Sequence, residues 1–169
     1  MKKMYHYQSE HFRYDSIRVE DTEALVEWRS NPDIIKYYST PLPVTRESHL
    51  NWFYKSYLKD DRRFDFIVSD GEIQVGFVAL MYIDYEAKAA EVNYTIGNPD
   101  YTGRRLSPEM INALLKFGNS EFGLCEFTAV IHKENIASQK AILSAGFCLE
   151  DESGIFWKYG KKVEEWLPM

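Results

Sequence analysis

Charged and turn-forming residues gather in the stretch Glu91–Glu109. Here an alternating strand pattern passes through a Gly/Pro/Asn/Asp turn into a helix that starts on Ser107 and Pro108. Backbone N–H groups at a helix start are free, and the positive end of the helix dipole lies behind them. Arg104 and Arg105 stand beside this start. The pattern therefore predicts a site for a phosphate group.

Few other residues have the spacing of a catalytic or metal site. Cys125 and Cys148 lie in strand-like segments without partners at metal-ligand spacing, and we interpret them as small buried thiols. His132, at a predicted strand end, is more typical of a hydrogen-bonding or surface group than of an acid or base. We expect no metal site.

The bulk composition bounds the class of protein. With 169 residues, 45% hydrophobic and 15% aromatic, the chain can bury a substantial core, so we expect a single domain over residues 1–169. Its net charge of −6 argues against a general nucleic-acid or anionic-membrane surface. The first residues lack the apolar core of a secretory signal, and no apolar run is long enough to cross a bilayer. We expect a cytoplasmic protein without nucleic-acid or membrane partners.

Hydrophobic periodicity divides the chain into short elements, and only residues 1–13 are left unassigned. Asp70-Gly71 is a strong hairpin signal, and Gly123 is placed to end a helix. The order predicts one mixed α/β unit with an antiparallel meander in its middle. The expected elements are a strand at 16–19, helices at 22–29, after Pro32 and over about four turns from Thr45 to Leu58, strands at 64–68, 73–82 and 89–96, a helix at 107–122, a strand at 126–131, a helix at 135–145, and strands at 147–150 and 155–159.

Two segments carry a resemblance to a known family. The segment His132–Phe147 contains Asn135, then Ser138, then a closing Gly-Phe pair. Together with the element order and the phosphate-type turn, it resembles the GCN5-related N-acetyltransferases (GNAT) over nearly the whole chain. The segment Glu27–Tyr37 resembles the opening of the subgroup that contains ribosomal-protein alanine acetyltransferases and amino-sugar-nucleotide acetyltransferases.

The resemblance implies a fold and a co-substrate. The fold would be α/β (α+β), with a mixed, mostly antiparallel central sheet of about seven strands, splayed fourth and fifth strands, and helices on both faces. The pantetheine arm of acetyl-CoA would lie in the gap where Tyr94–Gly97 faces Thr128–Ile131, and the turn would hold the diphosphate without a metal. The implied cofactor-binding residues are Tyr94, Thr95, Ile96, Gly97, Thr102, Gly103, Arg104, Arg105, Leu106, Ser107 and Asn135.

The resemblance also implies catalytic roles. Glu91 lies where this subgroup often carries a Glu, and a general base there would draw a proton from the acceptor ammonium. Its alternative is a strand carboxylate that pairs with a neighbour or faces solvent. Many members place a Tyr seven residues after the Asn, as the acid for the leaving thiolate, but Ile142 stands there and no tyrosine takes its place nearby in the sequence. Ser138 is a candidate substitute, or an ordinary packing residue.

The acceptor would be a primary amine on a protein N-terminus, an amino-sugar nucleotide or a small molecule, bound by a monomer or homodimer. Trp28, Arg29 and Tyr37 belong to an aromatic N-terminal half that shapes the acceptor pocket in this family, although most of its aromatic residues are expected in the core. A sugar nucleotide would need stacking faces and an arginine, whereas a protein N-terminus would need acidic residues. The sequence contains both sets.

Two positions depart from the family's turn pattern, and the first is Thr102, which stands where Gln or Arg is usual. Arg105 stands where a glycine is usual, and its Cβ should resist a positive φ and crowd a phosphate. We therefore expect either a reshaped turn whose arginines reach the phosphates directly or poor CoA affinity. Together with Ile142, this departure leaves two alternatives: a non-catalytic acyl-CoA-binding or interaction module, and a binding protein that uses no cofactor.

Overall fold

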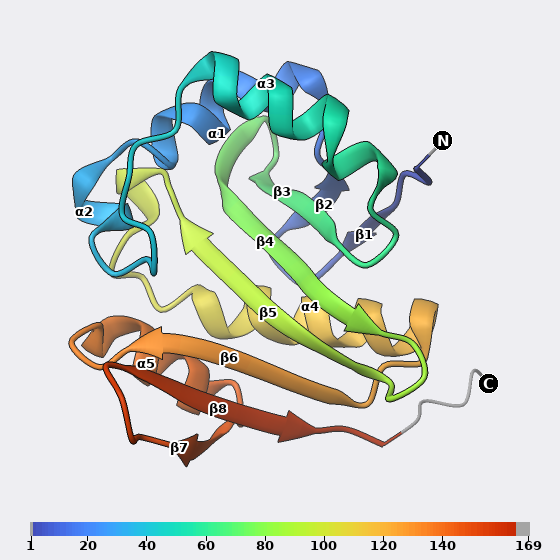
Figure 1. The fold of residues 1–169 in the computed structure, drawn as a ribbon, viewed down its shortest axis with the longest axis vertical. Coiled ribbons are helices and arrows are strands. Elements are labelled where there is room, and N and C mark those ends of the chain that lie inside the picture. The colour runs from blue at the N-terminus through green and yellow to red at the C-terminus, as the bar shows by residue number, and fades with distance from the viewer. Residues whose placement is uncertain (1, 165–169) are drawn as a thin grey trace.

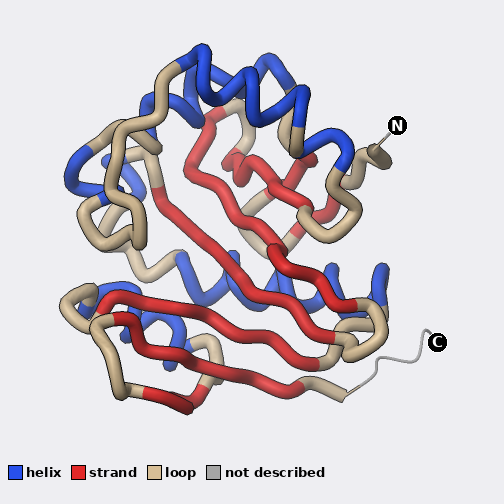
Figure 2. The backbone as a smooth tube through the Cα atoms, viewed as in Figure 1, coloured by secondary structure: helices blue, strands red, loops and turns tan. Residues whose placement is uncertain are grey.

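The computed structural model describes residues 2–164, which form one eight-stranded sheet with helices on both faces (Figures 1 and 2). The strand order is β1-β2-β3-β4-β5-β6-β8-β7, and among the described residues neighbours pair antiparallel except β5 and β6, which are parallel. The strands are β1 (His6–Gln8), β2 (Arg13–Ser16), β3 (Phe64–Asp70), β4 (Ile73–Asp84), β5 (Ala89–Ile96), β6 (Glu126–His132), β7 (Cys148–Asp151) and β8 (Phe156–Lys162). The helices are α1 (Thr22–Trp28), α2 (Pro32–Ile35), α3 (Arg46–Lys55), α4 (Ser107–Phe122) and α5 (Ile136–Ser144), with 3₁₀ turns η1 (Val19–Asp21), η2 (Tyr57–Lys59) and η3 (Pro99–Tyr101).

The sheet separates two hydrophobic layers. In the larger layer, Met110 and Leu114 of α4 pack with Leu80 of β4. In the smaller, Trp28 of α1 and Phe53 of α3 pack with sheet residues from the opposite face. Figure 1 shows α4 passing behind the sheet, with α1 and α3 along its upper edge. The mixed, mostly antiparallel fold expected from the sequence is thus confirmed, with eight strands in place of about seven.

Alternation along β5 decides which side chains face each layer. Ala90 and Val92 are buried in the larger layer. Because successive strand residues point to opposite faces, Glu91 and Asn93 face the side that carries α1 and α3.

The N-terminal segment differs from the expectation. The strand expected at 16–19 lies earlier, as β2, and the unassigned segment before it forms β1, which pairs with β2 at the sheet edge. Tyr7 explains this pairing, since its ring stacks at 4.5 Å on Tyr14 and at 4.7 Å on Phe117 of α4. Contacts between residues so far apart in the sequence leave no local period to detect.

Several local signals were confirmed. Gly71 in the β3–β4 turn has φ 59° and Gly123 after α4 has φ 70°, conformations that glycine adopts without steric cost. The predicted start of α3 is a capping box, in which the Ser48 amide donates to the Thr45 hydroxyl at 3.0 Å. The helix is shorter than the four turns expected, because the chain tightens into η2 after Lys55.

The interpretation of both cysteines as small buried thiols was wrong. Cys148 is exposed, because it lies on the edge strand β7, and Cys125 is only partly buried before β6. Both thiols are free.

Candidate active site

A fork between β5 and β6 is the central feature of the sheet. The two strands pair over only three positions, from Ala89 opposite Glu126 to Glu91 opposite Thr128, and then diverge toward the carboxyl end of β5 (Figure 1). Beyond Glu91, β5 stays paired with β4 on its other side as far as Ile96. The splay expected from the sequence is therefore present, and the backbone of β5 faces the gap without a strand partner.

The turn after β5 presents a row of free backbone donors. Gly103 has φ 77° and Arg105 has φ 57°, and Leu106 follows with φ −91° and ψ −21°. A left-handed residue followed by a right-handed one makes a concave nest of N–H groups that suits an anion. The N–H groups of residues 103–107 donate to no described residue, and Leu106 makes no side-chain cap.

One part of the expectation for Arg105 was wrong. We expected its Cβ to resist a positive φ, yet the residue takes the left-handed conformation that a glycine would take. Such a conformation costs an ordinary residue roughly 1–2 kcal/mol, a cost that the surrounding fold can offset. The turn therefore keeps its row of free backbone N–H groups without a glycine at position 105.

The side chains of the two arginines in the turn have different surroundings. The Arg104 guanidinium lies 4.7 Å from the Tyr101 ring centre and donates to the Asp100 carbonyl at 3.4 Å. Arg105 is exposed and makes no hydrogen bond or ion pair with residues 2–164. Arg105 is therefore free to reach an anion held by the turn. Thr102 precedes the turn as an exposed residue with φ −68°.

The far side of the fork is formed by the start of α5. Asn135 caps this helix by accepting from the Ser138 amide at 3.2 Å. Ile142 is fully buried, so the usual tyrosine position belongs to the core. A tyrosine is nevertheless present, since the Tyr94 hydroxyl from β5 lies 2.8 Å from Ser138 Oγ and donates to the Ser138 carbonyl at 3.1 Å.

Sequence reasoning missed this use of the Tyr94 side chain. We expected no tyrosine near the missing acid and gave Tyr94 only a backbone role, because the two residues that meet are 44 positions apart. Burial raises the pKa of Tyr94 to about 12, although the Ser138 hydrogen bond opposes the shift. The phenol is therefore protonated at neutral pH and can act as a hydrogen-bond donor.

Glu91 lies at the apex of the fork, at the last position where β5 pairs with β6. Its side chain is half-buried and makes no hydrogen bond or ion pair within the described part of the chain. Burial raises the pKa of this carboxyl above its ordinary value of 4.5. An unpaired carboxylate with a raised pKa is suited to accept a proton, so the alternative of a paired strand carboxylate is not what the structure shows.

Two tyrosines after α2 reach both arms of the fork. The Tyr37 ring centre lies 5.3 Å from the ring centre of His132 at the end of β6. The Tyr38 hydroxyl lies 3.3 Å from Thr95 Oγ1 on β5. These two residues therefore bridge the open end of the fork on the side of α1–α3.

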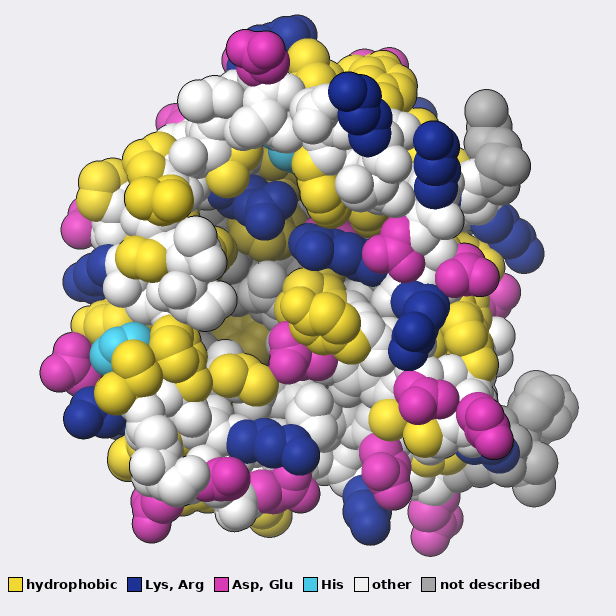
Figure 3. All heavy atoms as spheres, viewed as in Figure 1, with side chains coloured by type: hydrophobic (Ala, Val, Ile, Leu, Met, Phe, Trp, Pro, Cys, Tyr) yellow, Lys and Arg dark blue, Asp and Glu magenta, His cyan; other side chains and the backbone are white. Residues whose placement is uncertain are grey.

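The other two predicted acceptor residues have different surroundings. Trp28 is only 6% exposed and packs on Phe77, with ring centres 6.2 Å apart, so it supports the wall and offers no open stacking face. Arg29 ends α1, and its guanidinium lies 5.7 Å from the Trp52 ring centre. Figure 3 shows a hollow in this face below the helices, with Lys and Arg side chains inside it.

The described residues contain neither a group of metal ligands nor a membrane-spanning helix. Among residues 2–164, no three His, Cys, Asp or Glu side chains lie where they could hold a metal ion together. In the same range, none of the helices has the length and apolar character needed to cross a membrane.

The chain is similar to known proteins over most of its length. The family model described as "Acetyltransferase (GNAT) domain" matches residues 12–148. An uncharacterized N-acetyltransferase, p20 of Bacillus licheniformis, is 25% identical over 150 residues, covering 86% of this chain and 82% of that protein.

Solved structures show the same fold. A spermidine N-acetyltransferase from Vibrio cholerae, in complex with CoA and spermine, superposes with a TM-score of 0.79 at 18% identity, covering 92% of this chain and 96% of that one. The microcin C7 self-immunity acetyltransferase MccE, in complex with acetyl-CoA and AMP, gives 0.76 at 18% identity, covering 91% and 93%.

Proposed function

Because this chain belongs to the GNAT acetyltransferase family, it is an acetyl-CoA-dependent acyltransferase, and we propose that it transfers the acetyl group to a primary amine held beside Glu91. The observation that carries this proposal is the fork itself. It combines diverging strands, a row of free N–H groups at its open end and an unpaired carboxylate at its apex.

The turn would bind the diphosphate of acetyl-CoA. The N–H groups of residues 103–107 would donate to its oxygens, and Arg105 would add charge-assisted hydrogen bonds. The pantetheine arm would lie along Tyr94–Gly97 toward Asn135, against the backbone groups that face the gap. The thioester would then lie inside the fork, on the path to Glu91.

The chemical step would be direct attack. The ammonium proton passes to Glu91, directly or through water, so that the nitrogen lone pair is available for attack. The amine nitrogen then forms a bond to the thioester carbonyl carbon, the C–S bond breaks, and the sulfur leaves as a thiolate. The nitrogen loses its second proton as the amide forms, and this proton passes to the leaving sulfur or to water. The fork supplies proximity, because it holds both reactants in one place.

The leaving thiolate would accept a hydrogen bond from the Ser138 hydroxyl, and the Tyr94 phenol would then donate to Ser138 Oγ in place of the Ser138 carbonyl. A thiolate is a good leaving group, so a hydrogen bond to it should contribute less to kcat than the general base does. We expect Ser138→Ala and Tyr94→Phe each to lower kcat by about tenfold or less and to leave the acetyl-CoA Kd unchanged. Tyr94→Phe should also lower the free energy of unfolding by about 1 kcal/mol, since it removes a hydrogen bond.

A double-mutant cycle tests the pairing of these two residues. The two hydroxyl oxygens lie 2.8 Å apart, so their effects should be coupled. The fold-decrease in kcat of the double variant should therefore be smaller than the product of the two single fold-decreases. Strictly multiplicative losses would show that Tyr94 does not act through Ser138.

The acceptor class is open among three candidates: a protein N-terminal amine, an amino-sugar nucleotide and a small amine. The two structural neighbours differ in what they hold, since one binds the cation spermine and the other the anion AMP. The fold therefore accommodates ligands of opposite charge. The side chains that line the hollow must determine which acceptor this chain binds.

The experiment that tests the proposal is an acetylation assay on a panel of amines from the three classes. Free CoA thiol and acetylated product should appear together, at a rate that depends on the amine and on the enzyme. Binding of acetyl-CoA without turnover on any amine would favour the non-catalytic acyl-CoA-binding module instead.

A further inference from the structure

A group of polar and aromatic side chains lies under α1 and α3, and we call it the arginine recess: Arg29, His49, Trp52, Arg63 and Asp65. The Trp52 ring lies at its centre. The guanidinium of Arg29 lies 5.7 Å from that ring centre and the guanidinium of Arg63 lies 4.9 Å from it, while the His49 ring centre is 5.5 Å away.

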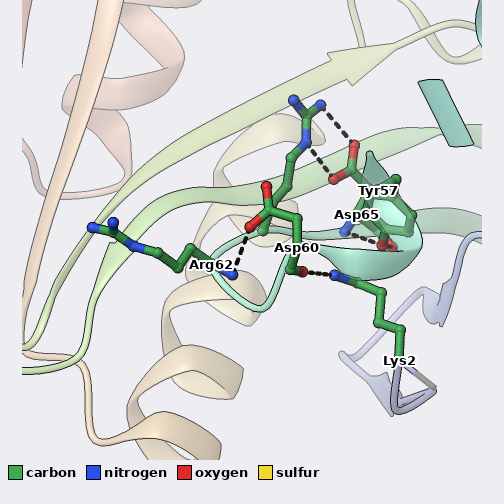
Figure 4. Close-up of polar contacts among 6 residues, drawn as sticks. Lys2, Tyr57, Asp60, Arg62 and Asp65 are labelled. Carbon is green, nitrogen blue, oxygen red and sulfur yellow. Dashed lines mark hydrogen bonds and ion pairs between the residues drawn. The ribbon is translucent and has the colours of Figure 1, made fainter. Parts of the chain in front are cut away.

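Only one of the two arginines has a counter-ion. The Arg63 guanidinium donates two hydrogen bonds to the Asp65 carboxylate, at 2.8 and 3.0 Å. Figure 4 shows the Asp65 amide, which donates to the Tyr57 hydroxyl at 2.8 Å, so Asp65 is fixed in place. The Arg29 side chain makes no hydrogen bond or ion pair within residues 2–164, and its Nε is buried without a partner.

His49 adds a second unsatisfied group. The residue is 2% exposed, and neither ring nitrogen has a hydrogen-bond partner in the described part of the chain. Burial, followed by the charge of Arg29, lowers the pKa of His49, so its ring is neutral at physiological pH and keeps one N–H to donate. Burial also lowers the pKa of Arg29, while the Asp65 charge opposes the shift.

A partly buried cation without a counter-ion is unfavourable, and a well-placed anion offsets part of the cost of its desolvation. A guanidinium matches phosphate and carboxylate oxygens in a bidentate geometry. The surroundings of Arg29 therefore favour an anionic ligand.

The register of the sheet connects this recess to Glu91. Asp65 pairs with Ala79 on β4, and Ala79 pairs with Asn93 on β5, which lies two residues from Glu91 on the same face. Two strand spacings separate Asp65 from Asn93, roughly 10 Å. Asp65 and Glu91 therefore lie on the same face of the sheet, the face that carries α1 and α3.

We propose that the arginine recess binds an anionic group, a phosphate or a carboxylate, carried by the amine acceptor whose nitrogen is acetylated beside Glu91. The proposal rests on the function proposed above and names its substrate class. A polyamine is excluded as a preferred acceptor, because the uncompensated charge of Arg29 repels it.

Matched amines test the proposal. Glucosamine 6-phosphate against glucosamine gives the phosphate arm, 4-aminobutyrate against butylamine gives the carboxylate arm, and spermine gives the cation arm. Binding is measured by thermal shift with saturating CoA, so that the phosphate-binding turn is already filled, and turnover is measured as kcat/KM. For at least one pair, we expect the amine with the anionic group to exceed the amine without it by tenfold or more, both in affinity and in kcat/KM. The arm that shows the preference identifies the anion.

Arg29→Gln should abolish that preference and leave the acetyl-CoA Kd unchanged within about twofold. The variant should fold, since it removes an unpaired buried charge. Arg46→Gln, which removes an exposed arginine paired with Glu23 at the start of α3, is the charge-matched control and should keep the preference. A preference for spermine, or for the amines that lack an anionic group, would overturn the proposal. So would a preference for the anionic group that survives Arg29→Gln. Anion binding without any turnover would support the recess and contradict the proposed function.

Discussion

Glu91→Gln should lower kcat by roughly 10²–10⁴-fold, the usual contribution of a general base, while the acetyl-CoA Kd stays unchanged. The amide has nearly the shape of the carboxylate but cannot accept the ammonium proton. Because Glu91 lies at the apex of the fork without a partner among the described residues, no neighbouring carboxylate is placed to replace it.

The pH dependence of wild-type kcat/KM should carry the signature of this carboxyl. Burial raises its pKa above 4.5, so activity should fall as the pH drops through that raised pKa, and the acid limb should disappear in Glu91→Gln.

Glu91→Gln should raise the stability of the protein although it lowers kcat. A carboxyl whose folded pKa is raised binds more protons in the folded state than in the unfolded state, so its charge destabilises the fold once the pH exceeds that pKa. Glu91→Gln should therefore raise Tm at neutral pH. Glu86→Gln, in the exposed β4–β5 turn, is the matched control and should change neither Tm nor kcat. Wild-type turnover in Glu91→Gln would remove this residue from the mechanism.

Arg105→Ala should raise the Kd for acetyl-CoA by about tenfold to a hundredfold, since a charge-assisted hydrogen bond contributes about 1.5–3 kcal/mol. The guanidinium is exposed and has no partner within residues 2–164, so it is free to reach the diphosphate. The difference between the two affinities should shrink at high salt, because salt screens exposed charges. Isothermal titration at two salt concentrations measures both effects.

Two variants separate the charge of Arg105 from its backbone conformation. Arg104→Ala should weaken binding less, because that guanidinium already lies over Tyr101. Arg105→Gly should bind as weakly as Arg105→Ala, yet be more stable by about 1 kcal/mol, because glycine takes φ 57° without strain. Tighter binding by Arg105→Gly than by wild type would show that the arginine obstructs the phosphate.

The sequence predicted the elements whose signals are local. The Asp70-Gly71 hairpin and the helix that ends at Gly123 depend on turn and cap residues that act within a few positions. The splay of β5 from β6 was expected through family resemblance and not from such signals, since nothing in either strand alone sets where pairing stops.

Features that depend on distant contacts were missed. The pairing of β1 with β2 depends on aromatic stacking onto α4, and the Tyr94–Ser138 contact joins residues 44 positions apart. The arginine recess gathers residues from α1, α3 and β3, none of which has a motif. The left-handed Arg105 shows a further limit, because a propensity rule gives only the cost of a conformation, and the tertiary structure decides whether that cost is met.

The placement of acetyl-CoA in the β5–β6 fork can be tested most directly by following backbone amide signals in an NMR titration with acetyl-CoA. The amides of residues 103–107 have no acceptor among the described residues, so hydrogen bonds to the diphosphate should give them the largest downfield shifts in the chain. Residues of β5 beyond Glu91 should shift at the same ligand concentrations. Unchanged amides at 103–107 up to millimolar acetyl-CoA, or the largest shifts in another part of the molecule, would contradict the account.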